Sequence, residues 1–149
     1  MGYSAKPLVV IVDDDSKVRE SLESLLRAAA FTAVVFSSAE KALQSGTLAQ
    51  ASCLITDMRM PGIQGLELQQ LVKRDYPKLP IIIITGHRDE HVRQSALFEG
   101  AASFLYKPFD PQTLLHAIHV AILGTSESKT PNLHERSVAQ KKTGKVFGR

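Results

Sequence analysis

Residues 53–62 read CLITDMRMPG, a short apolar run that ends on an aspartate, Asp57, and is followed by a loop that turns at Pro61-Gly62. A continuous apolar run of this length, bounded by a turn signal, is typical of a strand that is covered on both faces. An acid at the end of such a strand more often caps a helix or solvates a loop than takes part in chemistry. The rest of the chain decides between these interpretations of Asp57.

The composition indicates one folded domain that does not enter a membrane. The chain has 149 residues, of which 44% are hydrophobic and 22% are charged, and this length is enough for a domain with a real core. The longest apolar run, LPIIII at 79–84, falls far short of the roughly 20 residues of a membrane helix. The N-terminus MGYSAKP lacks the apolar core of a secretory signal, and the single cysteine, Cys53, allows no internal disulfide. We therefore expect a cytoplasmic protein.

The positive charge of the chain is concentrated at its C-terminal end. The formal net charge is +3, but residues 125–149 hold six lysines and arginines against two glutamates, which leaves −1 for residues 1–124. The C-terminal segment is also poor in large apolar residues. We interpret residues 1–124 as one domain and residues 125–149 as a basic polar tail or linker without a second recognisable domain. The body itself carries no basic footprint for nucleic acid.

The body of the chain alternates two patterns. Short apolar or β-branched runs are separated by stretches with helical period, and these runs are LVVIV (8–12), AVVF (33–36), CLIT (53–56), IIIIT (81–85) and SFLY (103–106). Their apolarity is continuous rather than alternating, which favours strands of a parallel sheet that is buried on both faces. Five strand–helix pairs predict a three-layer α/β domain with right-handed crossovers.

The ends of the helices carry signals of their own. Ser37-Ser38-Ala39-Glu40 has the form of a capping box at the start of the second helix. The fourth helix is predicted over about 89–99, with Gly100 as its C-terminal cap. Pro111 is a favoured residue for the first turn of the last helix.

Polar residues follow four of the five predicted strands. Because reactive groups in such sheets lie beyond the carboxyl ends of the strands, these residues are expected to converge on one edge: Asp13-Asp14-Asp15 after the first strand, Asp57 and Thr85 at the ends of the third and fourth, and Lys107-Pro108 after the fifth. Clustered carboxylates raise one another's pKa and therefore favour a cation, and hard oxygen ligands suit Mg²⁺. The simpler interpretation is that Asp13 to Asp15 only cap the first helix.

These residues make the chain resemble the CheY-like receiver domain of two-component response regulators, over about residues 7–123. The matching stretches are VDDD (12–15), TDMRMPGIQG (56–65), ITGH (84–87) and KPFD (107–110), and their order and spacing together are highly specific. The likeness is greatest to FixJ-type receivers. The resemblance implies a doubly wound, flavodoxin-like, five-stranded parallel sheet of order 2-1-3-4-5 with five helices.

The resemblance also implies a role for Asp57. It would be the phosphoacceptor that attacks the phosphoryl group carried by a sensor histidine kinase or a phosphotransfer protein. Asp14 would bind Mg²⁺, or Mn²⁺ in its place, directly and Asp13 would bind it through water. Asp57 and the backbone carbonyl of Arg59 would complete the protein ligands. This is phosphoryl transfer by positioning and charge neutralisation.

Three further residues would transmit the phosphorylation. Lys107 would pair with the phosphoryl oxygens, through a peptide bond to Pro108 that is cis in the family. Thr85 would donate a hydrogen bond to one phosphoryl oxygen, and Phe104 occupies the family's aromatic switch position, although a plain core aromatic fits Phe104 equally well. The output would be a change in the surface of the fourth helix, fifth strand and fifth helix, through which a homodimer is also expected.

Arg59 and His87 lie two residues after Asp57 and Thr85, at positions that flank the path of hydrolytic water in the family. Our hypothesis is that these bulky, potentially cationic side chains alter the lifetime of the acyl phosphate. The alternative is that both are solvated loop residues.

Two other classes of protein compete with this interpretation. A phosphatase of the haloacid dehalogenase type needs a second aspartate two residues after the nucleophile, where this chain has Arg59. We therefore expect no turnover enzyme, only a domain that catalyses its own Mg²⁺-dependent phosphorylation and dephosphorylation. The second alternative is the N-terminal receiver of a truncated DNA-binding transcriptional regulator. The tail shows no helix-turn-helix pattern, so nucleic acid would be bound only by a missing output domain.

Overall fold

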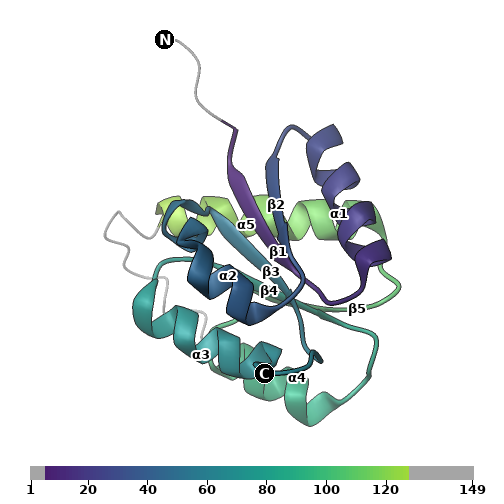
Figure 1. The fold of residues 1–149 in the computed structure, drawn as a ribbon, viewed down its shortest axis with the longest axis vertical. Helices are drawn as coiled ribbons and strands as arrows, with labels where there is room; N and C mark the ends of the chain where they lie inside the picture. Colours follow the sequence, from purple (N-terminus) through teal and green to yellow (C-terminus); the bar gives the residue numbers. More distant parts are fainter. Residues whose placement is uncertain (1–5, 128–149) are drawn as a thin grey trace.

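A computed structural model of the chain describes residues 6–127. The strands are β1 (Leu8–Val12), β2 (Thr32–Phe36), β3 (Cys53–Asp57), β4 (Ile81–Thr85) and β5 (Ser103–Tyr106). The helices are α1 (Ser16–Ala28), α2 (Ala39–Ser45), the short 3-10 helix η1 (Thr47–Gln50), α3 (Gly65–Asp75), α4 (Glu90–Phe98) and α5 (Pro111–Glu127). Figure 1 shows the strands at the centre with the helices around them. The predicted alternation of strands and helices is confirmed.

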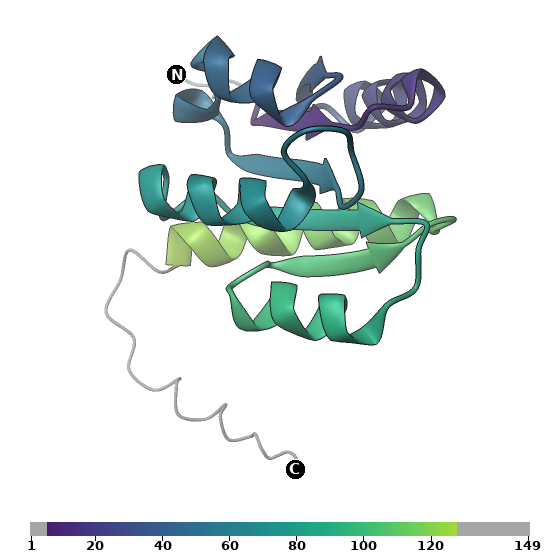
Figure 2. The same cartoon turned by 60° about the horizontal axis from the view of Figure 1, so that its bottom comes forward.

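The five strands form one parallel sheet in the order β2-β1-β3-β4-β5, as the resemblance implied. Val12 is paired with Thr56, and Asp57 is paired with Ile84. The carboxyl ends of β1, β3 and β4 are therefore neighbours, and the arrowheads of the sheet point toward the same edge in Figure 2. This edge receives the residues that follow the strands.

The sheet is covered on both faces, which explains why its strands are continuously apolar. Val10 and Val12 of β1 face a core that includes residues of α2, α3 and α4, whereas Val9 and Ile11 face a core with α1 and α5 (Figure 1). All five residues of β3 are buried, among them Cys53, whose pKa is raised to about 12 by burial. Cys53 is therefore a neutral core thiol. No helix within residues 6–127 combines the length and apolarity that crossing a bilayer requires.

The helix ends agree with the predictions except at α2. Asp89 is the N-cap of α4 and accepts a hydrogen bond from the Val92 amide, and Gly100 has the left-handed conformation just beyond the helix (φ 107°). Asp15 is the N-cap of α1 and accepts from the Lys17 amide. The helix-capping interpretation of the three consecutive aspartates therefore holds for Asp15.

The predicted capping box at α2 is wrong. The N-cap is Ser38, whose side chain accepts from the Lys41 amide, so the helix begins one residue later than a box between Ser37 and Glu40 requires. The Glu40 carboxylate instead accepts a hydrogen bond from the Ile63 amide, in the loop between β3 and α3, at 3.0 Å. Glu40 therefore binds the distant Ile63 amide instead of the Ser37 amide that the capping box requires.

Candidate functional site

Three carboxylates gather at the carboxyl edge of the sheet. One oxygen from each of Asp13, Asp14 and Asp57 lies within 4.8 Å of the other two. Asp13 is fully buried and Asp57 is 7% exposed, whereas Asp14 is exposed to solvent. The pairing of β1 with β3 brings these residues together, because Asp13 directly follows Val12 and Asp57 directly follows Thr56 in the register.

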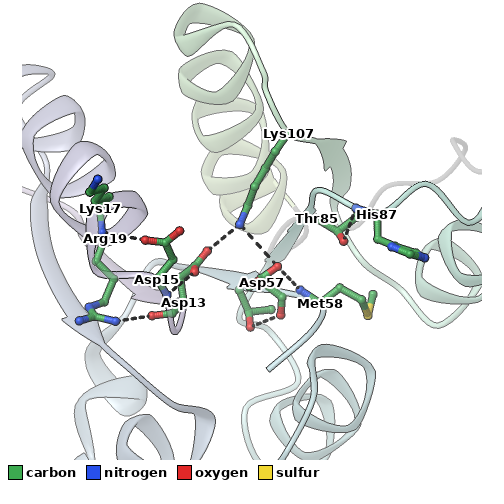
Figure 3. A network of polar contacts seen from close by, with 10 residues as sticks. Asp13, Asp15, Lys17, Arg19, Asp57, Met58, Thr85, His87 and Lys107 are labelled. Atoms are coloured by element: carbon green, nitrogen blue, oxygen red, sulfur yellow. Dashed lines mark hydrogen bonds and ion pairs between the residues drawn. The ribbon is translucent and has the colours of Figure 1, made fainter. Parts of the chain in front are cut away.

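Lys107 reaches this cluster from the end of β5. Its Nζ lies 3.0 Å from Asp13 Oδ2 and 3.7 Å from Asp57 Oδ1, and Figure 3 shows the side chain pointing down between the two carboxylates. The Lys107 amide donates to the Thr85 carbonyl at 2.7 Å, which ties this loop to the end of β4. The Lys107-Pro108 peptide bond is cis, as the resemblance implied.

The surroundings of the Asp57 carboxyl disfavour its charged form. Burial is the main cause that raises its pKa, and repulsion from the Asp13 carboxylate raises it further. The Lys107 ammonium and a hydrogen bond from the Met58 amide to Oδ1, at 2.8 Å, act in the opposite direction. Both of these contacts are made by Oδ1. Burial and repulsion therefore destabilise the Asp57 carboxylate, and a bound cation would stabilise it.

Asp13 is fixed more completely than Asp57. Its Oδ1 accepts from the Asp15 amide at 2.9 Å, while its Oδ2 pairs with Lys107. The Arg19 guanidinium of α1 donates to the Asp13 backbone carbonyl at 2.8 Å (Figure 3). Sequence reasoning missed Arg19, because only the folded structure shows that its side chain reaches back from α1 to the Asp13 carbonyl.

Thr85 and Phe104 lie behind this edge, whereas His87 turns away from it. Thr85 is 2% exposed, and its Oγ1 accepts from the His87 amide at 3.1 Å. Figure 3 shows the His87 side chain directed away from Asp57 and Lys107. Phe104 is 9% exposed and belongs to the core that faces α2, α3 and α4.

Tyr106 is a neighbour of Phe104 that sequence reasoning did not single out. The two rings meet edge to face with centroids 5.5 Å apart, and the Arg88 guanidinium lies 4.3 Å from the centre of the Tyr106 ring. Arg88 belongs to the β4–α4 loop, so this cation–π contact links that loop to β5. The run SFLY contains no signal that would distinguish Tyr106 from its neighbours.

The donor set fits a hard divalent cation. The cluster offers carboxylate oxygens from three residues, which are the ligands that Mg²⁺ takes in proteins. Lys107 is the ammonium that contacts two of the three, so one positive charge faces up to three negative ones. The surplus of negative charge, together with the raised pKa of Asp57, indicates a site that is complementary to a cation.

Comparison with known proteins identifies the class. The family model of the response regulator receiver domain matches residues 9–119. Nodulation protein W of Bradyrhizobium diazoefficiens is 39% identical over 140 residues, which cover 94% of this chain and 60% of that protein. The transcriptional regulatory protein FixJ of Azorhizobium caulinodans is 37% identical over 119 residues, covering 80% of this chain and 56% of that protein.

The solved structures agree. A response regulator receiver domain protein from Clostridium thermocellum superposes with a TM-score of 0.77 at 30% identity, over 80% of this chain and 97% of that one. The chain therefore belongs to the response regulator receiver domain family of two-component systems. It spans 60% or less of the length of the two curated relatives, which are longer proteins.

The environment of Asp57 predicts that this residue lowers the stability of the fold. We expect Asp57→Asn to raise the free energy of unfolding by on the order of 1 kcal/mol at neutral pH, because the neutral amide is neither desolvated as a charge nor repelled by Asp13. Urea denaturation in EDTA measures this change. The exposed Asp14→Asn serves as the control and should change stability less. An Asp57→Asn variant that is less stable than the parent protein would contradict the prediction.

Proposed function

We propose that Asp57 is the phosphoacceptor of this receiver domain and that its donor is the phosphohistidine of a sensor histidine kinase or a phosphotransfer protein. The observation that carries the proposal is the placement of the Asp57 carboxylate, at the end of β3, beside the Lys107 ammonium and within the Asp13 and Asp14 cluster. Because the donor is made from ATP, the proposal places the reaction in the cytoplasm.

The chain's own groups account for the transfer. Asp57 forms a bond to phosphorus while the bond from phosphorus to the donor imidazole breaks, and the electron pair of that bond returns to the imidazole nitrogen. The contacts of Oδ1 with Met58 and Lys107 leave Oδ2 as the oxygen that forms the bond. Lys107 pairs with the phosphoryl oxygens. Thr85 accepts from the His87 amide, so its hydroxyl proton remains available for a phosphoryl oxygen.

The metal that the family implies has defined ligands in this proposal. Asp14, Asp57 and the backbone carbonyl of Arg59 would hold Mg²⁺, or Mn²⁺ in its place, and Asp13 would act through a water molecule. This division is supported by the contacts of Asp13, both of whose carboxylate oxygens are already engaged, and by the exposure of Asp14. When bound, the ion neutralises charge on the transferring phosphoryl group. The domain thus promotes its own phosphorylation without being a turnover enzyme.

The proposed output is a change in the surface made by α4, β5 and α5. Thr85 and Phe104 would carry the change from the phosphoryl group to this surface. Two observations support this route: Thr85 is paired with Tyr106 in the register of β4 and β5, and Tyr106 contacts both Phe104 and Arg88. A homodimer through the same surface is part of the proposal.

A second candidate function concerns the whole protein. Relatives include the transcriptional regulatory protein FixJ and the DNA-binding transcriptional regulator NtrC of Escherichia coli, of which this chain covers 56% and 26%. We propose as the alternative that this receiver is the N-terminal part of a DNA-binding regulator. An open reading frame that continues past Arg149 into a helix-turn-helix domain would favour this alternative, and a stop codon after Arg149 would exclude it.

Incubation with Mg²⁺ and acetyl phosphate tests the phosphoacceptor. We expect the protein to gain one phosphoryl group that is stable in acid and labile in base, as a mixed anhydride on a carboxylate is. Asp57→Asn should accept none, because its amide is not a nucleophile. Lys107→Ala should still be phosphorylated, more slowly, because the metal remains. Mass spectrometry that maps the group to a serine, threonine or histidine, with Asp57→Asn labelled normally, would overturn the mechanism.

We also propose that Arg59 and His87 set the lifetime of the acyl phosphate. Arg59 is exposed in the loop that follows Asp57, and the amide of His87 is bonded to Thr85. Arg59→Ala and His87→Ala should each change the rate of phosphate loss from the phosphorylated protein. The control is Arg74→Ala, which removes an exposed arginine from the last turn of α3. Rates equal to that of the parent protein would show that Arg59 and His87 are solvated loop side chains without an effect on the acyl phosphate.

The proposed domain boundary can be tested in the same assay. We propose that residues 1–124 form the receiver and that residues 125–149 are a tail or linker; α5 is described as far as Glu127, and the rest of the proposed tail lies outside the described residues. A chain ending at Glu127 should be phosphorylated at the rate of the full chain, because every residue of the proposed site lies between Asp13 and Lys107. Loss of phosphorylation on truncation would contradict this boundary.

A further inference from the structure

The loop between β3 and α3, residues 58–64, is held at its two ends by its own backbone. The Met58 amide lies 3.0 Å from the Ile84 carbonyl and donates to Asp57 Oδ1 at 2.8 Å. At the other end, the Gly65 amide donates to the Met58 carbonyl at 2.9 Å. These bonds close the base of the loop. Residues 59–63, which include Arg59 and the turn at Gly62, lie between these bonds and are called the tip of the loop here.

The tip is held by Glu40, a residue of α2 that lies 23 positions earlier in the chain. Its Oε2 accepts from the Ile63 amide at 3.0 Å, and the bond is partly buried. Among residues 6–127, no ion pair involves Glu40, so the carboxylate is directed at the loop backbone rather than at a cation. A hydrogen bond from an amide to a carboxylate is stronger than one to a neutral acceptor.

Gly62, which lacks a side chain, allows the Glu40 carboxylate to approach the loop closely. Its φ of 75° lies in the left-handed region, where a side chain is strained. A Cβ atom at this position would also overlap Glu40 Oε2. The absence of a side chain at Gly62 therefore serves both the turn and the close approach of the Glu40 carboxylate. The overlap at Gly62 and the bond to Ile63 both place Glu40 Oε2 against residues 62 and 63 of the loop.

We infer that Glu40 is a positioning residue for the divalent cation. By binding the Ile63 amide, it restrains the β3–α3 loop, which carries the proposed ligand, the Arg59 carbonyl, two residues after Asp57. Glu40 thereby raises the affinity of the unphosphorylated protein for Mg²⁺ without contacting the ion. This inference rests on the proposed function, because it requires that the Arg59 carbonyl be a ligand.

Titration of the unphosphorylated full chain with Mg²⁺, followed by calorimetry or by backbone amide NMR shifts, tests the inference. Glu40→Ala should weaken binding roughly three- to tenfold, the effect of losing about one hydrogen bond that holds the loop. Glu40→Gln should bind within about twofold of the parent protein, because its amide oxygen still accepts from Ile63. Glu67→Gln, which removes an exposed acid from the first turn of α3, controls for the loss of negative charge and should also bind normally.

Two further variants keep the test decisive. Gly62→Ala should weaken Mg²⁺ binding at least as much as Glu40→Ala, because the added methyl displaces the carboxylate from Ile63 and also strains the turn. It therefore replaces Glu40→Ala if that variant does not fold, as urea denaturation would reveal. Hydrogen exchange at the Ile63 amide should be faster in both variants, which shows that the loop has been released.

The outcomes separate the inference from the proposed function. If exchange at Ile63 quickens while Mg²⁺ affinity is unchanged, Glu40 holds the loop without positioning a ligand, and the inference is overturned. Equal weakening by Glu40→Gln and Glu40→Ala would show that its charge acts through space, which also overturns the inference. Asp14→Ala is the reference variant and should abolish binding. Normal binding by Asp14→Ala would overturn the metal site itself, and with it the inference.

Discussion

The contact of the Lys107 ammonium with Asp13 and Asp57 is the interaction on which the site depends. A parallel sheet with both faces covered directs the ends of its central strands to one edge, so carboxylates that follow β1 and β3 are forced together. Their mutual repulsion adds to the cost of burial and raises the pKa of Asp57. The Lys107 ammonium offsets part of that repulsion, and a bound cation would offset the remainder. The same residual repulsion that raises the pKa of Asp57 is what makes the site complementary to a cation.

Side chains help to hold the loops around this edge, in addition to backbone hydrogen bonds. Arg19 and Asp15 fix the β1–α1 loop, and Asp89 fixes the start of α4 after the β4–α4 loop. Glu40 reaches the β3–α3 loop from a separate helix. Each of these bonds joins a charged side chain to the backbone and so orients the loop that it contacts. Such preorganisation is what transfer by positioning and charge neutralisation requires.

The aromatic residues of β5 give the edge a connection to the surface of the domain. Phe104 is packed into the core, and Tyr106 stands between it and the Arg88 guanidinium of the β4–α4 loop. Thr85 lies at the root of that loop and is paired with Tyr106 across the two strands. A shift of Thr85 toward a phosphoryl group would therefore act on a loop that is already attached to β5 by the cation–π contact. These contacts form the packed connection that the proposed output would use.

The sequence by itself determined the elements and the residues at their ends, because both depend on local patterns. Buried strands are continuously apolar, Gly100 follows the end of α4, Pro111 begins α5, and Asp57, Thr85 and Lys107 lie where strands end. The order of the strands came from the resemblance rather than from the residues. The tertiary structure alone decided which of the three consecutive aspartates caps α1, and it replaced the expected capping box at α2 with the bond from Ile63 to Glu40. The pairing of Asp13 with Lys107 joins residues 94 positions apart, and the contact of Arg88 with Tyr106 joins the β4–α4 loop to the end of β5. Local propensity carries no information about such contacts, because the packing of the sheet and its helices brings the partners together.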